Sequence, residues 1–138
     1  MHFNPYVAIL GGERVGATGL EPNFFDFDAK FRRLLVDDGV EVRSKDRGKA
    51  HNKPSGKLNG LLVTHGHEDH MGNLPLTMVD NPEIPVYMSH TSCFQSDLTL
   101  NDSLRVIRRN MALDRHNDLL RSCYYKFVKG MKYALRDV

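Results

Sequence analysis

The sequence has few cysteines, no long hydrophobic run and no large excess of either charge. Its two cysteines, Cys93 and Cys123, form no Cys-x-x-Cys pair, and so small a number does not support a disulfide framework. No apolar run reaches the length of a membrane-spanning helix, and the opening MHFNPYVAIL lacks the basic and apolar regions of a signal peptide. These absences predict a cytoplasmic protein with reduced thiols and no membrane partner.

The formal net charge of +2 is too small to indicate nucleic-acid binding by itself. The placement of the charges along the chain is therefore more informative than their sum. Hydrophobic residues make up 41% of the sequence and charged residues 26%, which is typical of globular proteins and argues against wholesale disorder. A chain of 138 residues fits one domain with a sizeable core.

Short apolar segments separated by turn residues dominate the first ninety residues. The pattern predicts strands at 6–10, 33–37, 58–64 and 85–88. A helix is expected between the last two strands, at about 72–79, because Asn81 and Pro82 would end it. Glycines between the first two strands predict a tight turn and a close backbone approach.

Helical periodicity replaces the strand pattern in the rest of the chain. Asn101 or Asp102 is expected to cap one helix, and a second helix is expected at 117–129, with Gly130 at its end. Strands with glycine turns, then a strand–helix–strand stretch, then further helices predict an α/β fold. The expected organisation is one domain over 1–138, strand-rich over 1–90 and helical over 91–138.

The segment 61–70, LLVTHGHEDH, contains most of the chemistry that the sequence reveals. An apolar strand is followed within six positions by four side chains that can bind a metal: His65, His67, Asp69 and His70. A continued strand would separate these side chains, so a compact loop is favoured. Imidazole nitrogens and a carboxylate oxygen suit Zn²⁺, and also Mn²⁺ or Fe²⁺.

Four such ligands at one strand end form half of a site for two metal ions. In such sites the ions lie roughly 3.5–4 Å apart and activate a bridging water as the nucleophile. The alternative is a histidine-rich surface loop that binds no metal. The number of ligand-type residues and their place directly after a buried strand disfavour that alternative.

The segment THGHEDHMGNLP resembles the metal-binding signature of the metallo-β-lactamase superfamily. LLVDDG at 34–39 is similar to that family's strand ending in aspartate and glycine, and Asp37 is the matching position. GGERVGATG, IPVYMSHTS and DLTLNDSLRVIRR resemble segments of the β-CASP nucleases, the group of ribonuclease J and the mRNA 3′-end endonucleases. The residue sequence HGHEDH is most similar to that of the ribonuclease J type.

This resemblance implies a fold, a cofactor and a set of roles. The implied fold is the N-terminal half of an αββα sandwich, followed by helices. Residues matching His65 and His67 bind one metal and residues matching Asp69 and His70 the second, with Zn²⁺ expected and Mn²⁺ as an alternative. Asp69 and His70 are also the expected catalytic residues. Asp37 would orient a metal-binding side chain without contacting the metal itself. The implied reaction is hydrolysis of RNA phosphodiesters by a hydroxide that two metals activate.

The sequence departs from the family pattern downstream of the signature. The family takes a further histidine, a bridging aspartate and a late histidine from the second half of its fold. Only His90 and His116 remain downstream here, and neither stands in a matching ligand motif. We therefore expect a truncated piece of such an enzyme, which would form a homodimer or bind a partner chain that supplies the missing half.

Basic residues are concentrated between the second and third predicted strands. They could contact RNA phosphates, but a solvated loop is the favoured interpretation. The residues are Arg43, Lys45, Arg47, Lys49, Lys53 and Lys57.

The sequence leaves the enzymatic status of the chain open, because part of the metal site is missing. A metal-dependent ribonuclease is the main hypothesis. A non-nuclease hydrolase of the lactonase or thioesterase type is one alternative, and a non-catalytic metal-binding remnant or interaction module is the other.

Overall fold

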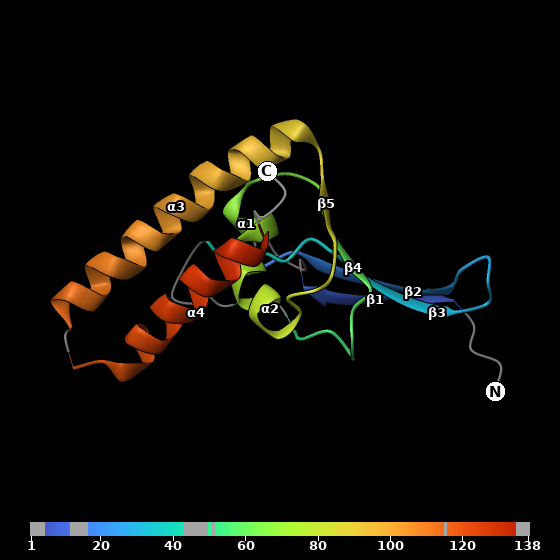
Figure 1. The fold of residues 1–138 in the computed structure, drawn as a ribbon, viewed down its shortest axis with the longest axis horizontal. Helices are drawn as coiled ribbons and strands as arrows, with labels where there is room; N and C mark the ends of the chain where they lie inside the picture. Colours follow the sequence, from blue (N-terminus) through green and yellow to red (C-terminus); the bar gives the residue numbers. More distant parts are fainter. Residues whose placement is uncertain (1–4, 12–16, 43–49, 51, 115, 135–138) are drawn as a thin grey trace.

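The computed structural model describes residues 5–11, 17–42, 50, 52–114 and 116–134, and it forms one five-stranded sheet with helices beside it (Figure 1). The sheet has the order β1-β2-β3-β4-β5. The strands are β1 (Tyr6–Gly11), β2 (Gly19–Phe25), β3 (Phe31–Val36), β4 (Gly60–Val63) and β5 (Val86–Met88). The first three strands are antiparallel, whereas β4 is parallel to both β3 and β5. The predicted α/β class is therefore confirmed.

Two short helices and a long helical hairpin complete the described fold. The helices are α1 (Glu68–Met71), α2 (Leu74–Asp80), α3 (His90–Leu113) and α4 (Asp118–Ala134). Helix α4 packs against α2 and α3, and the α3–α4 hairpin extends from the end of the molecule opposite the β2–β3 turn (Figure 1). Among the described residues, no helix combines the length and the apolar character that a membrane span requires.

The structure corrects three expectations about individual elements. Strand β2 was not predicted, because its inward positions carry Glu21 and Asn23 instead of apolar residues. Helix α3 begins at His90, where the Ser89 hydroxyl accepts a hydrogen bond from the Ser92 amide, and not at the Asn101 or Asp102 cap. Helix α4 continues through Gly130 to Ala134.

Gly130 allows a close approach between two helices instead of ending one. An added Cβ at this position would lie 1.5 Å from the carbonyl oxygen of Pro75 in α2. The backbones of α2 and α4 therefore touch here, which a larger residue would prevent.

The hydrophobic core lies between one face of the sheet and the helices. Leu35 and Leu61 are completely buried in neighbouring strands, and they pack with Met71, Leu74 and Met78 from the two short helices. Helices α3 and α4 add Leu100 and Phe127 to the same core. This packing fixes the parallel strands β3 and β4 relative to α1, and the candidate site lies where these three elements meet.

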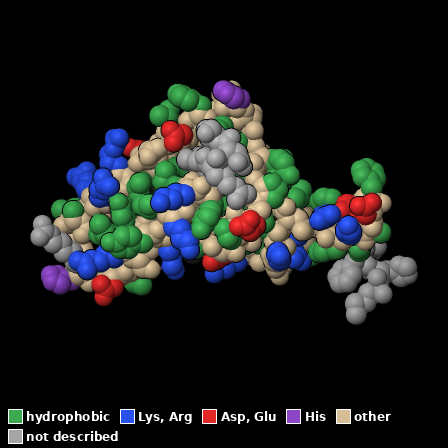
Figure 2. Space-filling view, viewed as in Figure 1, with side chains coloured by type: hydrophobic (Ala, Val, Ile, Leu, Met, Phe, Trp, Pro, Cys, Tyr) green, Lys and Arg blue, Asp and Glu red, His purple; other side chains and the backbone are tan. Residues whose placement is uncertain are grey.

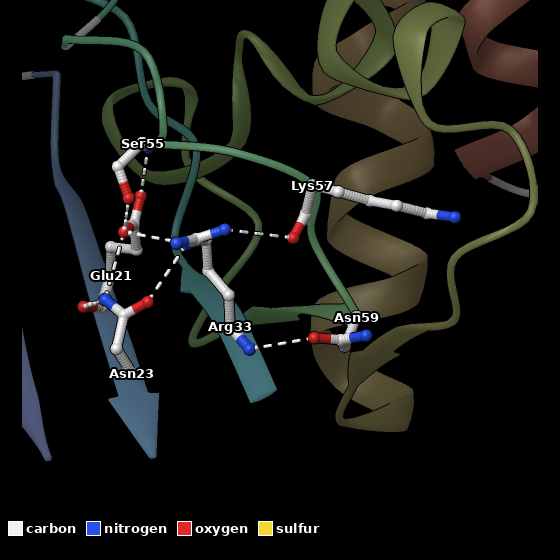
Figure 3. A network of polar contacts seen from close by, with 6 residues as sticks. All are labelled: Glu21, Asn23, Arg33, Ser55, Lys57 and Asn59. Carbon is white, nitrogen blue, oxygen red and sulfur yellow. Dashed lines mark hydrogen bonds and ion pairs between the residues drawn. The ribbon is translucent and has the colours of Figure 1, made fainter. Parts of the chain in front are cut away.

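A buried charged network lies on the core-facing side of the sheet, farther from the helices (Figure 3). The Arg33 guanidinium donates to Glu21 at 3.2 Å and to Asn23 at 3.0 Å, and the Glu21 carboxylate also accepts from the Ser55 amide at 2.6 Å. Arg33 also contacts the carbonyl of Lys57. The network therefore ties the segment before β4 to β2 and β3, and it satisfies a carboxylate that would be costly to bury alone.

The opposite face of the sheet exposes a continuous apolar row. Residues paired directly across all five strands form it, so their side chains lie on one side. The row consists of Ile9, Leu20, Val36, Leu62 and Tyr87. Ile9 is 69% exposed, Tyr87 56% and Leu62 40%. Five strands spaced by ~4.8 Å make the row about 19 Å wide. A contiguous apolar surface of this kind is typical of interfaces.

Candidate metal centre

The metal-capable residues lie at the carboxyl edge of the parallel strands. Val36 pairs with Leu62, so Asp37 and Thr64, which follow β3 and β4, reach the same edge of the sheet. The Asp37 amide donates to the Leu62 carbonyl at 2.8 Å. The Asp37 backbone then turns into the left-handed region, with φ of 61°, which aspartate tolerates better than most residues. This turn directs the chain back toward α1.

The Asp37 carboxylate connects the two strand ends to α1. It accepts a hydrogen bond from the Thr64 amide at 2.8 Å, and the Thr64 hydroxyl lies 2.9 Å from each carboxylate oxygen. It also accepts from the Nδ1 of His70 at 2.8 Å. With Nδ1 occupied in this way, the Nε2 of His70 is the nitrogen left for a metal.

His65, Asp69 and His70 bring one donor atom each into a common space. These donor atoms all lie within 4.8 Å of one another. The Nε2 of His70 is 3.6 Å from a carboxylate oxygen of Asp69, and the rings of His65 and His70 are 3.8 Å apart. His67 is not part of this group, but its ring lies edge-on to that of His65 at 4.8 Å. The structure therefore brings three of the four predicted ligands together and leaves the fourth beside them.

The electrostatic environment of His65 favours a neutral ring. Burial lowers the pKa of His65, and repulsion from His70 and His67 lowers it further, against a raising effect of Asp37 and Asp69. A neutral imidazole has a free nitrogen lone pair, so this lowered pKa keeps the ring competent to bind a metal.

Backbone contacts hold the ligand-bearing turn against the end of β3. The Asp69 carbonyl accepts from the Thr18 amide at 2.9 Å, and the Gly39 amide donates to the Thr18 carbonyl at 3.0 Å. The Asp38 amide donates to the His70 carbonyl at 2.6 Å. The positions of Asp69 and His70 are therefore fixed by the main chain as well as by Asp37.

Sequence reasoning did not identify the hydroxyl groups around the site. Thr64 contacts Asp37 and lies 3.1 Å from the Nδ1 of His65, and the Thr99 hydroxyl donates to the Gly66 carbonyl at 2.6 Å. The position of Thr64 at a strand end, next to two histidines, was a usable signal. The place of Thr99 in the site follows only from the fold, because 33 residues separate it from Gly66.

The other candidate residues lie outside the donor group. His90 and His116 are exposed, and neither belongs to a cluster of metal-capable side chains within the described part of the chain. Of the basic loop, Lys53 and Lys57 are exposed, whereas Arg43, Lys45, Arg47 and Lys49 lie outside the described residues.

Comparison with known proteins gives an independent view of the chain. No family model matches it. RNase aCSPSF2 of Saccharolobus solfataricus is 30% identical over 105 residues, which is 75% of this chain and 20% of that protein. Ribonuclease TTHA0252 of Thermus thermophilus is 31% identical over 80 residues, 55% of this chain and 18% of that protein. Ribonuclease J of Mycobacterium tuberculosis is 34% identical over 89 residues, 55% of this chain and 16% of that protein.

The chain is a relative of the β-CASP metallo-β-lactamase nucleases. The resemblance inferred from the HGHEDH segment is thereby confirmed. The chain spans 16% to 20% of the length of these β-CASP relatives. The family is metal-dependent, and the group of His65, Asp69 and His70 provides donors of the matching kind.

Proposed function

We propose that the chain binds a divalent transition metal at the carboxyl edge of its sheet and takes part in RNA phosphodiester hydrolysis. The observation that carries this proposal is the convergence of donor atoms from His65, Asp69 and His70 within 4.8 Å. The three similar proteins that carry ribonuclease names support RNA as the substrate class.

The donor set fits a metal such as Zn²⁺ or Mn²⁺. Two imidazoles and one carboxylate are a ligand combination that Zn²⁺ sites use, and the hydrogen bond from His70 to Asp37 is the support that metal-binding histidines typically have. Because their donor atoms converge, His65, Asp69 and His70 would hold the first ion, in place of the pairing of His65 with His67 that the resemblance implies. His67, beside His65, would contribute to a second ion or complete the first. A bound metal would supply Lewis acidity and lower the pKa of water.

The protein's own residues would orient these groups. Asp37 keeps the proton of His70 on Nδ1 and so directs Nε2 to the metal. Thr64 restrains the Asp37 carboxylate, and the Asp38 amide holds the backbone of His70. A ligand set arranged before metal binding loses less entropy when the metal binds.

Exposed basic side chains support binding of a polyanion. Helix α4 carries Arg121, Lys126, Lys129 and Lys132 against a single acidic residue, Asp118. Figure 2 shows Lys and Arg side chains gathered over the end of the molecule that α3 and α4 form. Contacts of this kind to RNA phosphates would give affinity that falls with salt and depends little on sequence.

An RNA cleavage assay tests this proposal. We expect the chain to cleave a single-stranded RNA in the presence of Zn²⁺ or Mn²⁺, and chelation to abolish cleavage. His70→Ala should lose this activity, whereas His116→Ala, which changes an exposed histidine outside the donor group, should retain it. Turnover of a thioester or lactone in place of RNA would favour the alternative hydrolase class. Cleavage that His70→Ala leaves unchanged would refute the site assignment.

The exposed apolar row favours a second role, as an interface. We propose that a second copy of the chain covers Ile9, Leu20, Val36, Leu62 and Tyr87. Burying such a row removes apolar surface from water, at roughly 25 cal/mol per Å². Because the row crosses the sheet from edge to edge, two copies related by a twofold axis can pair it with itself.

A further inference from the structure

One face of α3 carries a row of hydroxyl side chains that the proposed reaction does not use. The spacing of four, three and four residues places them on a single side of the helix. The row consists of Ser92, Ser96, Thr99 and Ser103. Ser92 and Ser96 are buried, although serine usually lies at protein surfaces. This hydroxyl row faces the loop that carries the metal-capable residues.

Thr99 makes the shortest contact between this row and the ligand loop. Its hydroxyl donates to the carbonyl of the buried Gly66 at 2.6 Å. Gly66 lies so close to α3 that an added Cβ would be 2.7 Å from the Ser96 amide nitrogen and 2.8 Å from the Gln95 Cβ. The loop is therefore pressed against the helix backbone at this point, and Thr99 supplies the partner that the Gly66 carbonyl needs there.

Two further hydroxyls of the row bind the loop on either side of Gly66. The Ser92 hydroxyl donates to the Thr64 carbonyl at 3.3 Å. The Ser103 hydroxyl donates to a carboxylate oxygen of Glu68 at 3.4 Å. Both distances are longer than that of the Thr99 bond, so these two contacts are weaker.

The contacted residues alternate with the metal-capable ones. Helix α3 holds positions 64, 66 and 68. The two positions between them carry the imidazoles of His65 and His67, and Asp69 and His70 follow directly after the last contact. The middle contact, at Gly66, lies between His65 and His67 in the chain. We propose that Thr99 is a positioning residue that sets the metal affinity and the coordination geometry of the site by fixing the loop at Gly66. This inference rests on the metal-binding part of the proposed function.

The physical reason is the cost of a buried carbonyl without a donor. Thr99→Val keeps the shape of the side chain but removes its hydroxyl, which leaves the Gly66 carbonyl unsatisfied or forces the loop to move. Because the ligands on both sides of Gly66 belong to this loop, such a movement displaces them. Loss of a residue that orients metal ligands typically lowers metal affinity about 10-fold to 100-fold.

Titration of four forms of the whole chain tests this inference. Zn²⁺ affinity and the visible absorption spectrum of the Co²⁺ form are measured for the unchanged chain, Thr99→Val, Thr99→Ser and Thr91→Val. Thr91 is an exposed threonine in the first turn of the same helix and provides the matched control. Thr99→Val should weaken Zn²⁺ binding about tenfold and change the Co²⁺ spectrum. Thr99→Ser, which keeps the hydroxyl, and Thr91→Val should match the unchanged chain.

The Co²⁺ spectrum distinguishes positioning from a general loss of stability. A variant that is merely less stable binds less Co²⁺, but the bound fraction keeps its spectrum, because coordination geometry determines that spectrum. Unchanged affinity and spectrum in Thr99→Val would overturn the inference. If Thr99→Val does not fold, Ser92→Ala replaces it, with a smaller expected effect because its hydrogen bond is longer.

Hydrogen exchange of the metal-free chain separates this inference from the proposed function. The amides of His70 and Met71 donate to the His67 carbonyl, so their exchange rates report on the order of the loop. Thr99→Val should accelerate their exchange relative to Thr91→Val. If the unchanged chain binds no metal, the proposed function fails, and equal exchange rates in these two variants then overturn the positioning role as well.

Discussion

Gly39 determines how closely the ligand-bearing turn approaches the end of β3. Its hypothetical Cβ would lie 1.7 Å from the Asp69 carbonyl oxygen and 2.8 Å from the Thr18 amide nitrogen. Both of these atoms belong to the backbone, so neither can move aside without moving the chain. The residue after Asp38 therefore fixes the position of Asp69 and His70 by having no side chain.

Gly39→Ala should both destabilise the fold and weaken metal binding. We expect a loss of about 1–3 kcal/mol in the free energy of unfolding, from the overpacked contact. Zn²⁺ affinity should also fall, because the displaced turn carries two ligands. Denaturant unfolding and Zn²⁺ titration measure the two effects.

Gly56→Ala is the control for this prediction, because its Cβ would meet the flexible end of the Arg33 side chain, away from the metal centre. It should leave Zn²⁺ affinity unchanged. Equal Zn²⁺ affinity in Gly39→Ala and the unchanged chain would show that this contact does not position the ligands.

At the scale of the elements, the buried carboxylate of Glu21 holds β2, β3 and the segment before β4 together. Burial raises the pKa of Glu21, but hydrogen bonds from Ser55 and Asn23 and the charge of Arg33 outweigh this effect, so the pKa lies below its ordinary value of 4.5. The ionised form is therefore bound more favourably in the folded chain than in the unfolded one. The network contributes its stability above pH 4.5 and loses it as the pH falls through the lowered pKa.

Glu21→Gln should remove this pH-dependent contribution. At pH 7 the variant should be less stable by about 1.5–3 kcal/mol, the range for hydrogen bonds to a charged group. The difference between the two forms should shrink as the pH falls below 4.5. Urea unfolding at a series of pH values measures it, with Glu83→Gln at an exposed position as the control. A difference that does not change with pH would contradict the role assigned to the ionised carboxylate.

Elements with regular apolar patterns were predictable from the sequence, and elements with inward polar residues were not. Strands β1, β3, β4 and β5 follow apolar segments, and the structure contains them close to the expected positions. Strand β2 places Glu21 inward, where its carboxylate is bound by Asn23 of the same strand and by Arg33 and Ser55, which are distant in the sequence. The first turns of α3 are polar for a similar reason, because Ser92 faces the ligand loop.

The candidate site likewise has a part that the sequence predicts and a part that it does not. The clustering of His65, Asp69 and His70 was visible as local spacing, because all three lie within six positions. The contribution of Thr99 depends on contacts between segments that are distant in the sequence, which no local pattern contains.

At the scale of the whole molecule, the exposed sheet face predicts self-association. Sedimentation velocity over a range of concentrations should show a dimer that dissociates on dilution. Leu62→Lys, at the β4 position of the apolar row between Val36 and Tyr87, should shift the chain to monomer, because it would bury an unpaired charge in the interface.

Leu119→Lys changes an exposed leucine on α4 and serves as the control for this prediction. It should leave the dimer unchanged. A chain that is monomeric at all concentrations would contradict the proposal that a second copy covers the face.

The metal content of the purified chain tests the central claim most directly. After Zn²⁺ loading and dialysis against metal-free buffer, elemental analysis should find at least one Zn²⁺ per chain. His70→Ala should lose most of this metal, because it removes one of the three convergent donors, and His116→Ala should retain it. Less than one Zn²⁺ per unchanged chain, or equal retention by the two variants, would contradict the assignment of a metal centre to this cluster.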